Sequence, residues 1–165
     1  MKRAIFLDRD GVINIDNNYI YKQKDVIFIE DIFKLVKLAN IRGYKVIVIT
    51  NQAGIGRGFY TEDDFIKICK WMKLIFHQNY CNIDDFFFCP YHPNHGIGKY
   101  RKDSYDRKPN PGMLLKARDK YKINMKYSIF IGDNISDMQA GENAGVGTLL
   151  LFDNYEINSN YKKIY

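Results

Sequence analysis

Short apolar runs alternate regularly with amphipathic segments along this chain, and this alternation limits the folds that it can adopt. The apolar runs predict five strands, at residues 4–7, 45–49, 85–88, 127–131 and 148–152. Apolar residues at helical spacing predict four helices between them, at residues 30–42, 61–79, 111–121 and 136–144. Such alternation is typical of an α/β fold with a doubly wound, Rossmann-like, mostly parallel sheet that carries helices on both faces.

Length and composition indicate one soluble domain that spans residues 1–165. Hydrophobic residues make up 46% of the chain and charged residues 27%, which is ordinary for a globular protein that buries a core. No apolar run approaches the roughly 20 residues of a membrane span, and acidic residues interrupt the apolar N-terminal run too early for a secretory signal. We therefore expect a cytoplasmic monomer without a membrane partner. Three cysteines without Cys-x-x-Cys spacing predict no disulfide framework.

Polar residues follow the predicted strands at the points where they end. Asp8 and Asp10 follow the first strand, Thr50 follows the second, and Asp133 follows the fourth. The loop after the third strand, about twenty residues long, leads to Lys108 and is long enough to suggest a function. Because ligands bind beyond the carboxyl ends of parallel strands, we expect these side chains to converge on one site.

The pair Asp8 and Asp10 predicts a magnesium-dependent phosphoryl-transfer site. Two carboxylates this close repel one another unless a cation lies between them, and Mg²⁺ prefers oxygen ligands. One carboxylate can attack phosphorus to give an aspartyl-phosphate, and the other can protonate the departing alkoxide and then activate water. Gly11 permits the sharp turn that follows. The alternative is a loop whose acids only cap the backbone or pair with Arg9.

Three later segments could supply the remaining parts of such a site. The Thr50 hydroxyl can donate to a phosphoryl oxygen, and Lys108 can stabilise the charge that develops there. Asp133 can complete a metal site with the Asp8 carboxylate and the Asp10 backbone. Asp137, on the first turn of the next helix, either orients the metal site or is simply an acid favoured at a helix N-terminus.

In this order, the motifs resemble those of the haloacid dehalogenase superfamily of phosphatases over about residues 3–152. Asp10 favours a phosphatase over a dehalogenase, which does not need the acid/base carboxylate. More narrowly, the chain is similar to the D-glycero-D-manno-heptose 1,7-bisphosphate 7-phosphatases and the related histidinol-phosphatases, which are capless. The motifs are Asp8-x-Asp10-Gly11, Thr50-Asn51-Gln52-x-Gly54-Ile55-x-Arg57-Gly58, Arg107-Lys108-Pro109-x-Pro111-Gly112-Met113 and Gly132-Asp133-x3-Asp137.

The resemblance implies a role for each matching residue. Asp8 would be the nucleophile and Asp10 the acid/base, while Thr50 and Lys108 would contact the phosphoryl group. Mg²⁺ would be held by Asp8, Asp10 and Asp133, and substrate recognition would involve Asn51, Gln52 and Arg107.

The chain departs from this family in the loop before Arg107. The family often holds structural zinc there with Cys-x-His and Cys-x-Cys. Here Cys89 is kept, but Tyr91, Ser104 and Asp106 occupy the other ligand positions, so we expect no zinc. An unorthodox site that combines Cys89 with the nearby His92, His95 and Asp106 is the alternative. A second departure is Asn134, where the heptose enzymes commonly place lysine.

The leading hypothesis is therefore a Mg²⁺-dependent phosphatase that removes one phosphate from a small sugar bisphosphate, most simply the 7-phosphate of D-glycero-D-manno-heptose 1,7-bisphosphate. The formal charge of +6 and a basic cluster at residues 99–108 suit a doubly phosphorylated substrate. Histidinol phosphate and a nucleic-acid 3′-phosphate are the alternative substrates. We do not expect nucleic acid as a partner, because the positive charge forms no long stripe. A non-catalytic binding module fits least well, since every catalytic position is filled.

Overall fold

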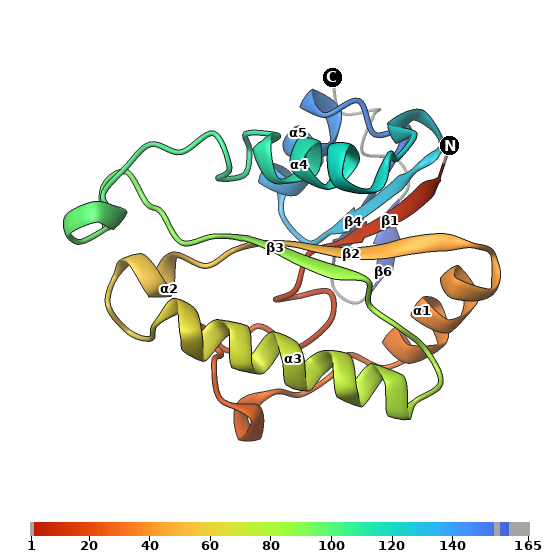
Figure 1. The fold of residues 1–165 in the computed structure, drawn as a ribbon, viewed down its shortest axis with the longest axis horizontal. Helices are drawn as coiled ribbons and strands as arrows, with labels where there is room; N and C mark the ends of the chain where they lie inside the picture. The colour runs from red at the N-terminus through yellow and green to blue at the C-terminus, as the bar shows by residue number, and fades with distance from the viewer. Residues whose placement is uncertain (1, 154–155, 159–165) are drawn as a thin grey trace.

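A six-stranded sheet lies at the centre of the computed structural model, which describes residues 2–153 and 156–158 (Figure 1). The strand order is β3-β2-β1-β4-β5-β6, and the first five strands in sequence are parallel, while β6 pairs antiparallel with β5. This arrangement confirms the predicted α/β fold with a mostly parallel sheet. The strands are β1 (Arg3–Leu7), β2 (Tyr44–Asn51), β3 (Asp85–Cys89), β4 (Ile129–Gly132), β5 (Thr148–Asp153) and β6 (Glu156–Asn158).

Two helices cover each face of the sheet, as the doubly wound fold predicts (Figure 1). One face carries α1 (Ile32–Ile41) and α3 (Glu62–Gln78), and the other carries α4 (Gly112–Tyr121) and α5 (Ile135–Asn143). The segments that follow β1 and β3 hold only short 3-10 turns within the described residues, at Gln23–Asp25 and Gly98–Tyr100. No additional folded unit in the described part of the chain therefore stands over the carboxyl edge of the sheet.

The boundaries of some elements differ from those that the sequence predicts. Strand β4 begins at Ile129 rather than at residue 127, because Met125–Tyr127 forms a 3-10 turn. Pro111 is the residue before α4 rather than its first helical residue. The four-residue helix α2 (Ala53–Gly56) and strand β6 were not predicted, since neither is long enough to show a periodic pattern. Most of the tail from residue 153, which the sequence specifies poorly, lies outside the described residues.

The central strands read as unbroken apolar runs because both faces of the sheet are buried. Successive side chains of a strand point to opposite faces, so Phe6 of β1 packs among the residues under α4 and α5, whereas Leu7 packs under α1 and α3. Phe130 of β4 meets Phe6 edge-on, with ring centroids 6.3 Å apart. Burial on both faces holds the strands in place, and it therefore also sets the position of the carboxyl edge of the sheet.

A capping box marks the start of α3, in the segment where the sequence predicts a helix over residues 61–79. The Thr61 hydroxyl accepts a hydrogen bond from the backbone N–H of Asp64 at 3.1 Å, and the Asp64 carboxylate accepts one from the backbone N–H of Thr61 at 3.0 Å. Each side chain thus satisfies a donor that the first turn of the helix leaves free. This cap fixes the start of α3 at Glu62, two residues after Tyr60.

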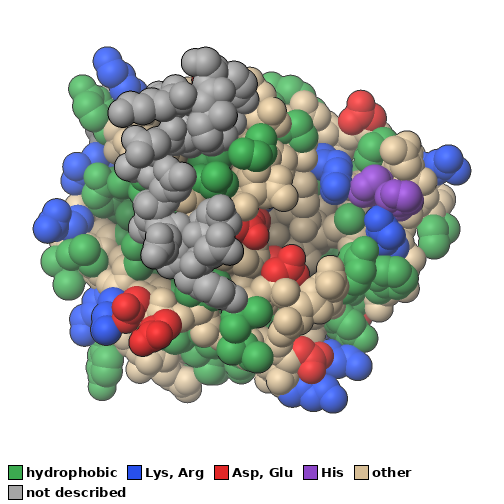
Figure 2. Space-filling view, turned by 180° about the vertical axis from the view of Figure 1, so that it is seen from behind, with side chains coloured by type: hydrophobic (Ala, Val, Ile, Leu, Met, Phe, Trp, Pro, Cys, Tyr) green, Lys and Arg blue, Asp and Glu red, His purple; other side chains and the backbone are tan. Residues whose placement is uncertain are grey.

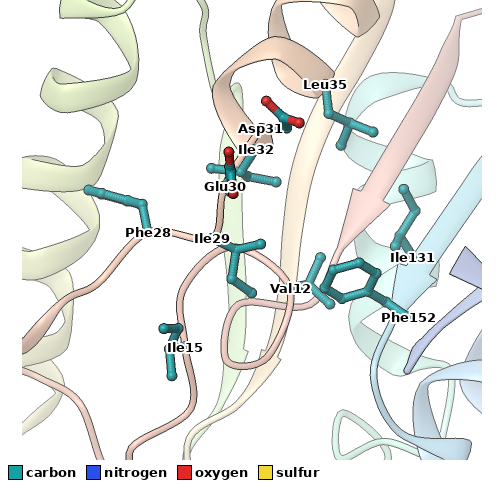
Figure 3. Close-up of a pocket in the computed structure, with 10 residues that line it drawn as sticks. All are labelled: Val12, Ile15, Phe28, Ile29, Glu30, Asp31, Ile32, Leu35, Ile131 and Phe152. Atoms are coloured by element: carbon teal, nitrogen blue, oxygen red, sulfur yellow. The ribbon is translucent and has the colours of Figure 1, made fainter. Parts of the chain in front are cut away.

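An apolar pocket of about 600 Å³ lies on the α1 side of the sheet (Figure 3). Its walls include Val12, Ile29, Leu35, Ile131 and Phe152, and it contains none of the predicted site residues. Among the described residues, no helix is long and apolar enough to cross a membrane.

The aromatic packing under α3 yields a stability prediction. Phe76 is fully buried, and its ring lies 4.7 Å from that of Phe33 and 5.8 Å from that of Phe28. We expect Phe76→Ala to lower the free energy of unfolding by about 3–5 kcal/mol, because it leaves a cavity in a packed core. Leu74 on the same helix is 53% exposed, so Leu74→Ala should cost less than about 1 kcal/mol. Urea unfolding of both variants measures the difference, and equal losses would contradict the prediction.

Candidate active site

A polar pocket of about 270 Å³ lies at the carboxyl edge of the sheet. Figure 2 shows a hollow on this side of the molecule with acidic side chains on its floor and arginine, lysine and histidine side chains to one side. The structure brings every predicted site residue to this pocket. They are Asp8, Asp10, Thr50, Asn51, Gln52, Arg107, Lys108 and Asp133.

The Lys108 ammonium lies at the base of the pocket and joins three elements. Its Nζ is 2.9 Å from Oδ1 of Asp8, which follows β1, and 2.6 Å from Oδ1 of Asp137 in α5. It also donates a hydrogen bond of 2.9 Å to the carbonyl oxygen of Ile49 in β2. Burial alone would lower the pKa of Lys108, but the carboxylates of Asp137 and Asp8 outweigh it and raise the pKa, so the ammonium stays charged.

Asp8, Asp133 and Asp137 form an acidic cluster whose ligand oxygens all lie within 4.8 Å of one another. Burial raises the pKa of Asp8 well above its usual value against the pull of Lys108, and the charges of Asp137 and Asp133 raise it further. Burial and the charge of Asp137 raise the pKa of Asp133 to about 6. When all three carboxyls are ionised, they carry more negative charge than the one ammonium balances.

Gly11 allows this cluster to form. It lies in the left-handed region at φ +84°, and a Cβ there would be only 2.0 Å from Oδ2 of Asp133. Because the backbone after Asp10 has no side chain at this point, the Asp133 carboxylate can approach it closely.

The donor set of the acidic cluster fits a divalent cation such as Mg²⁺. Mg²⁺ binds carboxylate oxygens and usually keeps several water molecules, so it needs only a few protein ligands. A cation between Asp8 and Asp133 would also relieve the repulsion that raises the pKa of both carboxyls. Asp137 contacts Lys108, as Asp8 does, and it also accepts a hydrogen bond of 3.0 Å from the backbone N–H of Asn134. Asp137 is thus a member of the acidic cluster and also caps the N-terminus of α5, so its position is compatible with either role that the sequence left open.

The side chain of Asp10 turns away from this cluster. The fully buried guanidinium of Arg9 donates to Oδ1 of Asp10 at 2.7 Å and to Oδ2 at 2.8 Å. Asn14 donates to Oδ1 at 3.0 Å, and Gln52 donates to Oδ2 at 3.1 Å. The Asp10 carboxylate is thus held by three side chains, and it does not belong to the acidic cluster.

The end of β2 carries three successive polar side chains whose hydrogen bonds go mainly to other groups of the protein, those of Thr50, Asn51 and Gln52. Asn51 donates to the Lys108 carbonyl at 3.1 Å and accepts from the Lys108 N–H at 3.1 Å, so its amide holds the Lys108 backbone. Gln52 donates to Oγ1 of Thr50 at 2.8 Å and is 2% exposed. Both amides line the pocket, but in this structure their hydrogen bonds order other site residues.

Arg107 and Arg57 bring positive charge to one side of the pocket. The Arg107 guanidinium is half-buried and donates to the Tyr91 carbonyl at 3.2 Å. Burial lowers the pKa of Arg107, and the charge of Arg57 lowers it further. Nε of Arg57 is buried without a hydrogen-bond partner among the described residues, and neither arginine forms an ion pair within that part of the chain. Two guanidinium groups held near each other in this way attract an anion.

The residues of the alternative zinc site have other partners. Nδ1 of His92 accepts hydrogen bonds from the backbone N–H groups of Asn94 and His95, and Asp106 pairs with Lys116. Cys89 is buried, and its Sγ lies 4.0 Å from the carbonyl oxygen of Tyr91. Within the described residues, the acidic cluster is the only group of three side chains arranged for a metal ion.

Sequence reasoning missed the residues that hold the site from behind. Arg9 stands inside the Asp-x-Asp motif, and its pairing with Asp10 was treated as an alternative to a functional site rather than as part of one. Tyr60 donates to Oε1 of Gln52 at 2.5 Å, and no signal in the sequence marks it. Arg57 lies in the motif that begins at Thr50, but the resemblance implied no role for it.

Known proteins with similar sequences and folds point to one family. A profile of haloacid dehalogenase-like hydrolases matches residues 99–151. The chain is 52% identical to the D-glycero-alpha-D-manno-heptose-1,7-bisphosphate 7-phosphatase of Burkholderia mallei, over 90% of this chain and 79% of that protein. It is 45% identical to the D-glycero-beta-D-manno-heptose-1,7-bisphosphate 7-phosphatase of Vibrio cholerae, over 91% of this chain and 81% of that protein.

A solved structure of similar fold is the D,D-heptose 1,7-bisphosphate phosphatase from B. bronchiseptica, in complex with magnesium and phosphate. It shares 30% identity with this chain and superposes with a TM-score of 0.78, over 92% of this chain and 80% of that one.

The acidic cluster yields a prediction about metal binding. Mg²⁺ should raise the midpoint of thermal unfolding by about 5 °C near saturation, because it binds the folded state and relieves the repulsion among the carboxylates. Asp133→Asn should raise the midpoint slightly without Mg²⁺ and abolish most of the Mg²⁺-dependent rise. Asp119 lies on the exposed surface of α4, so Asp119→Asn is the matched control and should keep the full rise. An unchanged rise in Asp133→Asn would rule out the cluster as the binding site.

Proposed function

Because the chain belongs to the D-glycero-D-manno-heptose-1,7-bisphosphate 7-phosphatase family of haloacid dehalogenase-like hydrolases, we propose that it removes the 7-phosphate of this sugar bisphosphate. The observation that carries the proposal is the carboxylate of Asp8, which lies 2.9 Å from the Lys108 ammonium in a pocket that also contains Asp10, Thr50 and Asp133. Nucleophile, acid/base and phosphoryl-binding groups thus meet in one place.

In the first step, an oxygen of Asp8 attacks phosphorus and the bond to the sugar oxygen breaks. Asp10 donates a proton to that oxygen, so the sugar leaves as an alcohol. Lys108 balances the charge on the phosphoryl oxygens, and the Thr50 hydroxyl donates to one of them. Thr50 is suited to this role because its Oγ1 accepts from Gln52 at 2.8 Å, while its own proton makes only a long bond of 3.5 Å to the Asn51 carbonyl, which a phosphoryl oxygen can replace.

In the second step, Asp10 takes a proton from a water molecule that attacks the phosphorus of the aspartyl-phosphate. The P–O bond to Asp8 breaks, and inorganic phosphate leaves with the carboxylate restored. Mg²⁺, held by Asp8, Asp133 and the Asp10 backbone, would supply positive charge next to the phosphoryl oxygens. The acidic cluster and the magnesium in the similar B. bronchiseptica structure support this choice of metal.

The phosphate that is not cleaved would bind at Arg107 and Arg57. Both guanidinium groups lack a carboxylate partner within the described residues, and Arg107 lines the pocket directly. A sugar with phosphates at both ends can reach from Asp8 to this side of the pocket, and its second phosphate would relieve the repulsion between the arginines. This arrangement favours a bisphosphate over a monophosphate substrate. We further propose that the enzyme acts in the cytoplasm as a monomer of one domain.

Phosphate release tests the reaction. With Mg²⁺ and the heptose 1,7-bisphosphate, the protein should release one phosphate and leave the 1-phosphate, whereas Asp8→Asn should lose at least about 10³-fold in kcat because the amide cannot attack phosphorus. Both anomers, histidinol phosphate and a 3′-phosphorylated oligonucleotide complete the screen. Asp119→Asn serves as a control with normal turnover. Faster turnover of either of the last two substrates would overturn the proposed substrate.

The arginine pair predicts a selective effect on the Michaelis constant. Arg107→Ala and Arg57→Ala should each raise KM for the bisphosphate about tenfold, since each removes one charged hydrogen-bonding group from the second phosphate. KM for 4-nitrophenyl phosphate, which has no second phosphate, should change less than about twofold. Arg118 on the exposed surface of α4 pairs with Asp119, and Arg118→Ala should affect neither substrate. Equal effects on both substrates would argue against a second phosphate site.

A further inference from the structure

The side-chain amide of Gln52 is hydrogen-bonded at both ends inside the protein. An amide has two N–H donors and a carbonyl oxygen that accepts. Nε2 of Gln52 donates to Oδ2 of Asp10 at 3.1 Å and to Oγ1 of Thr50 at 2.8 Å. Oε1 accepts from the Tyr60 hydroxyl at 2.5 Å. Gln52 therefore connects the acid/base carboxylate, a phosphoryl-binding hydroxyl and a tyrosine.

Only one orientation of this amide satisfies all three partners. An ionised Asp10 carboxylate can only accept hydrogen bonds, so it requires the NH₂ end of Gln52. If the amide turned over, its carbonyl oxygen would face the Asp10 carboxylate, and two acceptors would be left in contact in a buried place. The Tyr60 hydroxyl, which donates to the carbonyl end, opposes that rotation.

Tyr60 is held in a fixed position behind the pocket. It is 5% exposed, and its ring stacks on that of Tyr21 with centroids 4.9 Å apart and planes inclined by 11°. Gly54 leaves room for it, because a Cβ at Gly54 would lie 2.3 Å from the Tyr60 ring. Burial raises the pKa of the Tyr60 hydroxyl, so it remains a donor at neutral pH.

We propose that Tyr60 is a positioning residue, which acts through Gln52 to hold the Asp10 carboxylate and the Thr50 hydroxyl in their catalytic orientation. Arg9 and Asn14 hold the same carboxylate from the other side, but both approach Oδ1, and among the described residues only Arg9 and Gln52 reach Oδ2. Without the Tyr60 hydroxyl, the Gln52 amide loses its fixed orientation, and its hydrogen bonds to Thr50 and to Oδ2 of Asp10 are no longer held in place. This role concerns proton transfer in the phosphatase reaction and does not depend on which sugar phosphate is the substrate.

The variant Tyr60→Phe tests the proposal, because it keeps the ring and removes only the hydroxyl. With 4-nitrophenyl phosphate and Mg²⁺, the burst of nitrophenolate reports formation of the aspartyl-phosphate, and this leaving group needs no proton. The steady-state rate includes hydrolysis of the intermediate, which needs Asp10 as a base. We expect the steady-state kcat to fall about tenfold, while the burst rate falls less than about threefold and KM stays unchanged.

A double-mutant cycle separates action through Gln52 from a general structural effect. In the Gln52→Ala background, Tyr60→Phe should change kcat less than about twofold, because the residue through which it acts is gone. Gln52→Glu should be worse than Gln52→Ala, since it offers no donor and places a second carboxylate beside Asp10. Tyr21→Phe removes a hydroxyl from the neighbouring stacked ring and should leave both rates unchanged.

Each result bears on the proposal in one direction. A burst rate and a steady-state rate that fall equally in Tyr60→Phe, or an additive effect with Gln52→Ala, would overturn it. So would an unchanged kcat in Tyr60→Phe, provided that thermal unfolding and circular dichroism match those of the original protein. If the protein fails to cleave the heptose bisphosphate, the proposed substrate is wrong. The test of Tyr60 still holds in that case, because 4-nitrophenyl phosphate reports both the formation and the hydrolysis of the aspartyl-phosphate.

Discussion

The buried ammonium of Lys108 is the interaction on which the rest of the site depends. A charge in such a place is costly unless it is paired and hydrogen-bonded, and Lys108 meets both conditions through Asp8, Asp137 and the Ile49 carbonyl. Asp8 follows β1, Asp137 belongs to α5 and Ile49 belongs to β2, while Lys108 itself comes from the long loop after β3. One side chain thus ties four separate parts of the chain together at the carboxyl edge of the sheet.

The same ammonium explains how three carboxylates can share so small a space. Asp8 and Asp137 contact it directly, whereas Asp133 does not and is held close by the turn at Gly11. The remaining negative charge creates an affinity for a cation and then for a phosphoryl group that the cation and Lys108 can both contact. Stability and catalysis therefore use the same charges, and neither can be altered without the other.

Much of this arrangement could be predicted from the sequence, because it depends on local patterns. Apolar runs placed Asp8, Thr50 and Asp133 at strand ends, and parallel strands bring such ends to one edge. The Thr61–Asp64 pair that caps α3 is an equally local pattern. The direction in which the Asp10 carboxylate turns was not predictable, because it depends on Tyr60, Gln52 and Arg9, which meet only after the sheet has formed. Short elements such as α2 were not predicted for another reason: a single turn of helix is too short to show a periodic pattern of apolar residues.

Asn51 bonds to both backbone polar groups of Lys108, and this two-point clamp has a consequence for the evolution of the enzyme. The clamp fixes the end of the long loop independently of what the loop contains. Residues between Cys89 and Arg107 can therefore change without displacing the ammonium. Substitutions in this loop can therefore change which substrate binds without changing the position of Lys108. New substrate specificities can arise through substitutions in this one surface loop.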